Sequence, residues 1–400
     1  MKESNAIRVF QMPGLAVDMI KNEDGKIQLK GKGILRSIAK PILFAMNAPL
    51  SSEKPAYVTD DTVYPSIWVP PIPSPVFNRL IRDEIKMSFG RFVPETVSIE
   101  VVRRNNPNFK RHANLHGIEK PDYSDPPEEQ VKKTIDQALE MGAVVITFTE
   151  GDPLTNEKIA DYVRYVDKTK ASVMAYTWGL DLTPEKALAL KEAGLQTLLV
   201  SLYSTDPRVH DKKRGIEGAY EKAVAAISYG LDAGLLVAVA THLDDSKLEA
   251  GDMEKLWELS KELGVHEFSI WESVPTLEGE KQMGDSGRKR IRDFYKRINS
   301  SENGPRIFSS TVFEGDMFGT LAGRRWLHVT TEGDVWADPY IPMAYGNIHS
   351  EPLKKIWKKI RKEPALREKR DSHVLYDPNY LQKVRQANDW DFRQKRSNNK

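Results

Sequence analysis

The sequence predicts an α/β protein in which parallel strands form a partial (βα)6 TIM-like barrel, flanked by an N-terminal arm and a small C-terminal hairpin-plus-helix extension. Three observations predict this fold. Short β-branched runs alternate with helical segments between residues 97 and 272, the runs are almost continuously apolar, and the units repeat every ~25–35 residues. Such runs are typical of parallel strands, because helices cover both faces of the sheet. A doubly wound sheet is the alternative, and both architectures place an active site at the carboxyl ends of the strands.

Six runs are the strand candidates. They are VSIEVV (97–102), AVVITF (143–148), ASVMAY (171–176), TLLVSL (197–202), LLVAVA (235–240) and HEFSIW (266–271). Helix signals lie between them. Thr183 and Pro184 open one helix and Gly194 ends it, while Gly142 ends an earlier one. The segment 218–234 is a further helix candidate.

The chain divides into three predicted regions. Residues 1–92 are rich in proline and are expected to form an arm on the barrel, which spans 93–304, and residues 305–400 form the extension. Within the extension, WLHVTTEGDVWADP (326–339) contains two strand-like runs joined by a Glu-Gly-Asp turn. EPLKKIWKKIRKEP (351–364) places apolar side chains on one helical face and lysines on the other. This pattern predicts a helix with a solvated basic face.

Composition excludes several classes of function. The formal net charge of +2 gives no reason to expect a nucleic-acid partner. The chain has no cysteine, which excludes disulfides, a catalytic thiolate and any metal or cluster held by thiolates. The first residues carry no targeting signal, so the expected localisation is cytoplasmic.

Residues 33–50 are the most apolar stretch of the sequence. Arg36, Lys40 and Pro41 interrupt it, so we expect no transmembrane segment. A helix or an extended arm that covers the main body explains this stretch. Contact with a membrane surface is the alternative explanation.

The loops that follow the strand candidates carry a series of motifs. TEGDPL (149–154) follows the second run, YTWG (176–179) the third and SLYS (201–204) the fourth, and HDKKRG (210–215) comes next. The series resembles that of the radical S-adenosylmethionine (radical SAM) enzymes, in which these loops typically read Gly-Gly-Glu-Pro, Thr-Asn-Gly and Ser-Leu-Asp. Members with a C-terminal cluster region commonly add His-Asp-x-x-Arg-Gly, and the segment 210–215 matches it directly.

The resemblance continues into the C-terminal region. Residues 320–357 resemble the SPASM or twitch extension of the same superfamily, and 371–380 resemble its later segment. The matching residues are Ala322, Gly323, Gly333, Asp334, Val335, Gly346, Asn347 and Ile348. The resemblance therefore covers about residues 95–380, most of the chain.

This resemblance implies a chemistry and a set of contacts. A 4Fe-4S cluster would reduce the sulfonium of S-adenosylmethionine, and the resulting 5′-deoxyadenosyl radical would abstract hydrogen from a peptide or another bulky substrate. One group of residues would contact the methionine amino group, and a second group the ribose or the carboxylate. The first group is Glu150, Gly151, Asp152 and Pro153, and the second is Ser201, Arg214 and Thr241.

Every cluster cysteine of the family pattern is replaced in this chain. The three positions of the first-strand loop hold Asn105, Phe109 and His112, and those of the extension hold Thr320, Asp338 and His373. Iron–sulfur clusters are held mainly by thiolates, and this sequence offers none. We therefore expect no metal at these six positions.

The substitutions extend to groups that would touch S-adenosylmethionine. Glu150 stands where the family has glycine, and Asp152 where it has glutamate. Trp178 replaces the usual asparagine and Tyr203 the usual aspartate. A glutamate side chain at a glycine position can block the close approach of a ligand to the backbone. We therefore expect weak or absent S-adenosylmethionine binding.

Four functions fit these observations. The first is a cluster-free pseudoenzyme, either natural or redesigned without cysteine, that acts by binding or as a scaffold. The second is an active radical SAM enzyme that uses unusual ligands, or a parent that bears the cysteines. The third is a barrel metalloenzyme, because His112 and His116 are spaced for one helical face, and His242 or Asp338 could join them. The fourth is a membrane-associated interaction protein that uses 33–50 and the basic helix.

We expect the loop 103–117 to be ordered, with Phe109 buried in the volume that a cluster would fill. Burial of a phenylalanine stabilises by about 1.5–3 kcal/mol. Replacing Asn105, Phe109 and His112 together by cysteine should restore cluster binding, since the thiolates are then present. Anaerobic reconstitution with iron and sulfide would show charge-transfer absorption and about four irons per chain. The single Asn105→Cys variant is the control and should stay colourless. A triple variant that folds but takes up no iron would contradict this prediction.

Overall fold

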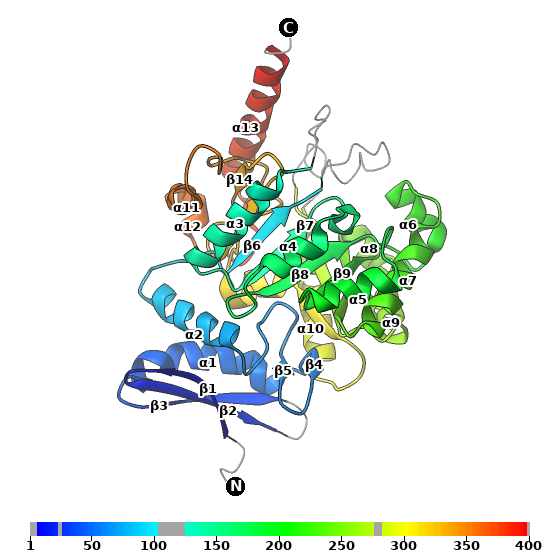
Figure 1. Ribbon diagram of the computed structural model, residues 1–400. Helices are drawn as coiled ribbons and strands as arrows, with labels where there is room; N and C mark the ends of the chain where they lie inside the picture. Colours follow the sequence, from blue (N-terminus) through cyan, green and yellow to red (C-terminus); the bar gives the residue numbers. More distant parts are fainter. Residues whose placement is uncertain (1–5, 23–25, 103–124, 276–281, 398–400) are drawn as a thin grey trace.

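The central element of the structure is an open sheet of nine strands, of which seven are parallel and lie in chain order. The seven are β6 (Thr96–Glu100), β7 (Val145–Thr149), β8 (Ser172–Thr177), β9 (Thr197–Ser201), β10 (Leu236–Leu243), β11 (Glu267–Glu272) and β12 (Arg306–Ser309). Each pairs with the next strand along the chain. The computed structural model describes residues 6–22, 26–102, 125–275 and 282–397 (Figure 1).

All six predicted strands are confirmed as parallel neighbours, with ends that shift by a few residues. The barrel is nevertheless larger than the predicted (βα)6 unit, because β12 adds a seventh strand. β12 is only four residues long and includes Arg306 among its buried residues, so it lacks the apolar run that marks the others. It also lies beyond residue 304, in the region assigned to the extension. The domain boundary itself stays a prediction.

The C-terminal region continues the same sheet. β13 (Trp326–Val329) pairs parallel with β6, and β14 (Val335–Trp336) returns antiparallel beside β13. The predicted hairpin is confirmed, and it joins the main sheet through β13. All four residues of β13 are buried, and pairing with β6 satisfies the backbone groups that an open strand edge would expose.

The helices that alternate with the strands form the outer layer (Figure 1). They are α3 (Glu128–Met141), α4 (Ile159–Tyr165), α5 (Pro184–Glu192), α6 (Pro207–Arg214), α7 (Ala219–Asp232), α8 (Asp245–Glu249), α9 (Asp252–Glu262) and α10 (Asp285–Asn299). The residues predicted to start and end helices do so in the structure. Thr183 Oγ1 accepts the backbone N–H of Lys186 at the start of α5, and Gly142 ends α3 with a φ of 116°.

The remaining C-terminal elements contact both the first and the last parts of the barrel. They are the π-helix η3 (Thr311–Phe318), α11 (Leu353–Ile360), α12 (Pro364–Arg367), the 3-10 helix η4 (Val374–Tyr376) and α13 (Pro378–Ser397), which projects from the body (Figure 1). The apolar face predicted for α11 is confirmed. Its buried residues are Leu353, Ile356, Trp357 and Ile360.

The N-terminal region, which the sequence predicts as an arm on the barrel, is a folded layer, and most of the stretch 33–50 is helical. Its elements are the antiparallel strands β1 (Ala6–Met12), β2 (Leu15–Lys21) and β3 (Ile27–Lys32), helices α1 (Arg36–Ser52) and α2 (Pro75–Ser88), and the short pair β4 (Tyr57–Val58) and β5 (Val63–Tyr64). The sheet and helices enclose a hydrophobic cluster of their own. None of the described helices has the length and apolar content needed to cross a bilayer.

The N-terminal layer also supplies a side chain to the bore of the barrel. The Trp68 ring lies 5.6 Å from that of Trp271, 5.4 Å from Phe308 and 5.7 Å from Trp326, between ring centroids. These three partners belong to β11, β12 and β13 and point inward. The four rings therefore close the bore between the two ends of the strands.

Candidate functional site

The carboxyl ends of the parallel strands surround a small cavity of about 80 Å³, here called the mouth cavity. Its lining is mainly aromatic and comes from the strand ends and the loop after β14. The aromatic lining residues are Tyr176, Trp178, Tyr203, Trp271, Trp326 and Tyr340. Pockets for cofactor-sized molecules usually have about 300–1,000 Å³. The rings therefore fill most of the space where a cofactor would lie.

Glu150 forms one wall of the mouth cavity in a backbone conformation that favours glycine. Its φ is 64°, and Gly151 follows with a φ of 59°. A left-handed conformation costs a residue with a side chain roughly 1–2 kcal/mol. Burial and the nearby Glu100 carboxylate raise the pKa of Glu150 to about 8. The glycine of the family pattern at this position would relieve both the strain and the burial of a carboxyl group.

Asp152 is buried, and the protein itself uses both of its carboxylate oxygens. Oδ1 accepts hydrogen bonds from Thr177 Oγ1 at 2.8 Å and from the Leu154 N–H at 3.3 Å, while Oδ2 accepts from the Trp178 N–H at 3.0 Å. Burial raises the pKa of Asp152, and these hydrogen bonds oppose that shift. The carboxylate caps the 3-10 helix η2 (Pro153–Thr155) and joins the loops after β7 and β8.

Arg214 ends α6 and lies buried between two aromatic rings. Its guanidinium carbon is 4.2 Å from the Trp178 ring centroid and 4.4 Å from that of Tyr203, which are cation–π distances. Burial lowers the pKa of Arg214. Its guanidinium nitrogens make no hydrogen bond within the described part of the chain. The Arg214 guanidinium keeps N–H donors for a carboxylate. However, Trp178 and Tyr203, which replace the family's asparagine and aspartate, cover both of its faces.

The other predicted contacts are divided between two sides of the sheet. Ser201 and His242 line the mouth cavity. Thr241 lies between Ala240 and His242 on β10, both of which face the cavity, so its side chain points to the opposite side. The structure thus brings Ser201 to Glu150 and Gly151, whereas Thr241 lies behind the strand. The assignment of these residues to cofactor contacts stays a prediction.

The His-Asp-x-x-Arg-Gly segment supports the local fold. His210 Nδ1 accepts the Tyr203 N–H at 3.2 Å, and burial lowers the pKa of His210 to about 4. The Asp211 carboxylate accepts the N–H groups of Gly218 at 2.7 Å and Tyr220 at 2.9 Å. The segment therefore fixes the turn between α6 and α7 and the position of Arg214.

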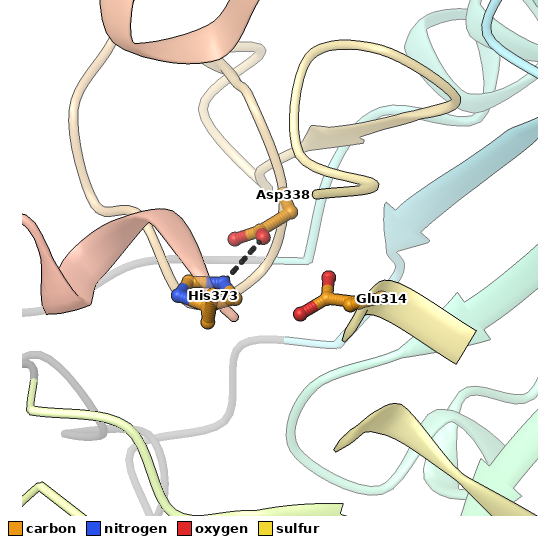
Figure 2. A group of neighbouring side chains, drawn as sticks. All are labelled: Glu314, Asp338 and His373. Carbon is orange, nitrogen blue, oxygen red and sulfur yellow. Dashed lines mark hydrogen bonds and ion pairs between the residues drawn. The ribbon is translucent and has the colours of Figure 1, made fainter. Parts of the chain in front are cut away.

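A second cluster of polar side chains lies in the extension. Glu314 from η3, Asp338 after β14 and His373 before η4 point toward one another (Figure 2). His373 Nε2 lies 2.9 Å from Asp338 Oδ2, and one ligand atom from each residue lies within 4.8 Å of the others. Thr320 is adjacent, since its Oγ1 donates to the Ser372 carbonyl at 3.2 Å. The three positions that the resemblance assigns to cysteine are therefore close in space.

Burial and charge together determine the protonation of this cluster. Burial, opposed by His373, raises the pKa of Glu314 to about 7. Burial alone would lower the pKa of His373, but the carboxylates of Asp338 and Glu314 raise it to about 9. In the neutral ring, His373 Nδ1 accepts the Leu375 N–H at 3.2 Å and the proton that faces Asp338 is on Nε2. Two carboxylates and an imidazole are ligands that divalent cations accept.

Glu314 is the member that the sequence reasoning missed. It lies in TVFEGDMF, a stretch with no spacing relation to the other two residues. Only the fold brings η3 beside the loops of Asp338 and His373. Asn105, Phe109, His112 and His116 lie outside the described residues, so the expectation for the first-strand loop stays a prediction.

The sequence and the fold both match a known superfamily. Residues 108–244 match the model of the Radical SAM superfamily. The chain therefore contains a radical SAM domain. It is 28% identical over 254 residues to an AdoMet-dependent heme synthase of Methanosarcina barkeri, covering 57% of this chain and 72% of the relative. A heme synthase of Nitratidesulfovibrio vulgaris is 25% identical, over 58% of this chain and 70% of its own length.

Solved radical SAM structures share the fold. Streptococcus suis SuiB bound to its precursor peptide SuiA superposes with a TM-score of 0.56 over 88% of each chain, at 13% identity. Native anSMEcpe with bound AdoMet gives 0.51 at 14% identity, over 67% of this chain and 82% of that one. At these identities the likeness extends to the fold alone, and it agrees with the open parallel sheet.

The radical SAM cofactors do not fit the residues present. A 4Fe-4S cluster needs thiolate ligands, and the sequence has no cysteine. In the extension, the family's cysteine positions hold a hydroxyl, a carboxylate and an imidazole. At the barrel mouth, the cavity of about 80 Å³ is too small for S-adenosylmethionine in this conformation.

Replacing Glu150 by glutamine should remove a pH dependence of stability. The pKa of Glu150 rises from 4.5 to about 8 on folding, so the folded state retains a proton that the unfolded state loses. Wild-type stability from this residue is therefore present below pH 4.5 and is lost as the pH rises through about 8. Chemical denaturation from pH 4.5 to 8 should show the Glu150→Gln variant gaining free energy of unfolding relative to wild type as the pH rises.

The exposed Glu157→Gln variant is the control, and its stability should follow that of wild type at each pH. A difference between Glu150→Gln and wild type that stays constant with pH would contradict the raised pKa of Glu150.

Proposed function

We propose that this protein is a cluster-free binding protein on a radical SAM fold and that it does not cleave S-adenosylmethionine. The observation that carries the proposal is the mouth cavity, where aromatic rings leave only about 80 Å³. The absence of cysteine supports it, because the electron donor of the family's reaction requires thiolate ligands. The hydrogen bonds that occupy both oxygens of Asp152 also support it.

The superfamily's own reaction remains the alternative for a parent that bears the cysteines. In such a parent, hydrogen abstraction from a peptide or another bulky substrate would take place at the barrel mouth. The SuiB structure contains a precursor peptide, which makes a peptide a reasonable candidate for that role. A cytoplasmic location also stays a prediction.

Calorimetric titration with S-adenosylmethionine tests the proposal. Wild type should give no saturable heat. Restoring the family residues together, as Glu150→Gly, Trp178→Asn and Tyr203→Asp, should produce measurable binding, because the changes open space beside Arg214 and relieve the backbone at 150. The control is Tyr165→Asp, an aromatic-to-aspartate change at an exposed site. Tight binding by the wild-type chain without iron would refute the proposal.

We infer, as a second candidate function, that the extension binds one divalent cation through Glu314, Asp338 and His373. The observation that favours it is the burial of three potential ligands within 4.8 Å of one another. Tetrahedral zinc ligands lie about 3.3 Å apart, so the most distant of these atoms would have to approach by up to about 1.5 Å. The cation would replace the Nε2 proton of His373, and the ring proton would move to Nδ1. That shift removes the hydrogen bond from Leu375, which opposes binding.

Zinc titration of the metal-free protein tests the second candidate. Wild type should bind one zinc ion per chain, and Asp338→Asn should reduce the affinity at least about tenfold because the charged ligand is lost. His349→Ala is the matched control, since His349 is exposed and its ring contacts Gln130 instead. Absence of zinc binding by wild type, or an equal loss in the control variant, would exclude this site.

A further inference from the structure

A second, much larger cavity lies at the opposite end of the barrel from the mouth. This basal cavity has a volume of about 790 Å³. Its walls come from α1, from the segment that carries Trp68, from the amino ends of β6, β7, β12 and β13, and from η3. The volume lies within the range of about 300–1,000 Å³ that small-molecule sites have. The N-terminal layer and the barrel therefore enclose a ligand-sized space far from the strand ends.

The inner wall of the basal cavity is apolar and largely aromatic. The residues at its deep end are Trp68, Phe308, Phe313, Phe318 and Trp326. Phe313 contacts both Phe308, at 4.7 Å between centroids, and Phe318, at 5.5 Å. On the α1 side, Ile42, Ala45 and Met46 continue the apolar wall. A wall of this composition favours a hydrocarbon chain over a polar ligand.

The charged groups around the cavity leave an excess of positive charge. Its four acidic lining residues already have basic partners: Glu53 contacts Arg306, Glu84 and Glu95 contact Arg325, and Asp316 contacts Arg292. Among the other basic lining residues, Lys54 donates to the Asn303 and Gly304 carbonyls. Arg324, Lys296 and Lys369 line the cavity without an ion pair to the described residues. Arg324 Nη1 is buried and has no hydrogen-bond partner there. The acidic head group of a ligand would balance this excess positive charge.

Helix α1 presents an apolar face that nothing in the described structure covers. Ile34, just before the helix, is 88% exposed, Ile38 is 46% exposed and Phe44 is 78% exposed. Ile34, Ile38 and Ala45 are spaced four and seven residues apart, so they share one side of the helix. Ala45 also lines the basal cavity. The exposed apolar face is therefore continuous with the cavity wall. Arg36 and Lys40 are also exposed, and they lie on the other side of the helix from Ile34 and Ile38.

We propose that the basal cavity binds a long-chain acidic amphiphile, which enters from an anionic membrane surface on which the exposed face of α1 rests. The apolar chain lies against the aromatic end of the cavity, and the acidic head meets Arg324 and the nearby lysines. The helix inserts Ile34, Ile38 and Phe44 among the lipid chains, while the long side chains of Arg36 and Lys40 extend from the polar side of the helix to the head groups. This inference gives the proposed binding function a ligand class. It concerns the other end of the barrel, so it does not depend on whether the mouth binds S-adenosylmethionine.

Fluorescence titration with oleate tests the cavity, with oleyl alcohol as the uncharged probe of equal chain length. Trp68 and Trp326 line the site and should report saturable binding of one oleate per chain. Ile42→Trp should weaken oleate binding at least about tenfold by filling the cavity, whereas the exposed Leu188→Trp should not. Arg324→Gln should weaken oleate about tenfold and leave oleyl alcohol unchanged, because it removes one charged contact. Arg208→Gln, at an exposed arginine, is the control.

Some results would overturn the cavity assignment. Absence of saturable oleate binding would do so, as would equal affinities for oleate and oleyl alcohol that Arg324→Gln does not change. If Ile42→Trp fails to fold by circular dichroism, the Arg324→Gln comparison alone decides the question. A result on S-adenosylmethionine binding, positive or negative, would test only the function proposed for the barrel mouth and not the oleate site.

Vesicle co-sedimentation tests the route of entry. Wild type should sediment with phosphatidylcholine vesicles that contain phosphatidylglycerol, and more weakly with phosphatidylcholine alone. The double variant Ile38→Glu, Phe44→Glu should lose sedimentation yet bind oleate in solution. The matched control is Leu188→Glu, Val209→Glu, which changes two exposed apolar residues elsewhere. Equal sedimentation of the two double variants, or none by wild type, would overturn entry from the membrane.

Discussion

The packing of Trp68 among Trp271, Phe308 and Trp326 is the constraint on which the arrangement of this molecule depends. One ring comes from the N-terminal layer and the others from three strands, so the contact holds regions distant in sequence together. Trp326 lines both the mouth cavity and the basal cavity. A single aromatic layer thus separates two spaces of very different size. Losing any of these rings would remove large apolar contacts from the core.

Two arginines with little solvent exposure reinforce the same junction. Arg325 contacts Glu84 on α2 and Glu95 before β6, while Arg306 on β12 contacts Glu53 and Glu267. Burial, opposed by the arginines, raises the pKa of Glu95 and of Glu267 to about 7. Such buried charges need their partners, because a lone charge in the interior is strongly destabilising. The N-terminal layer is therefore held to the barrel by charge as well as by apolar contact.

The parts of this fold that the sequence predicts are those with local causes. Apolar runs such as 197–202 mark buried strands, and Thr183 and Gly142 act within one turn of their helices. β12 was missed because a strand of four residues that begins with Arg306 has no continuous apolar run. Its arginine is buried only because Glu53 and Glu267 are brought beside it by other elements.

In the candidate sites, too, the sequence predicted what depends on local motifs and missed what depends on contacts between distant segments. Loop motifs predicted which residues surround the barrel mouth, and Glu150 and Ser201 do line it. Sequence could not show that Trp178 and Tyr203 enclose Arg214, since that contact joins three separate loops. The role of Glu314 and the whole basal cavity were equally invisible, because both arise where the extension or the N-terminal layer meets the barrel.

The pairing of β13 with β6 has a consequence during protein synthesis. Trp326 donates its indole N–H to Ser98, 228 residues earlier in the chain, and the two strands share their backbone hydrogen bonds. At translation rates of about 5–20 residues per second, β6 leaves the ribosome roughly 10–50 s before its second neighbour exists. Throughout that interval one edge of the first barrel strand is open to other chains. Folding yield in the cell therefore depends on how well that nascent edge is shielded until the last part of the chain emerges.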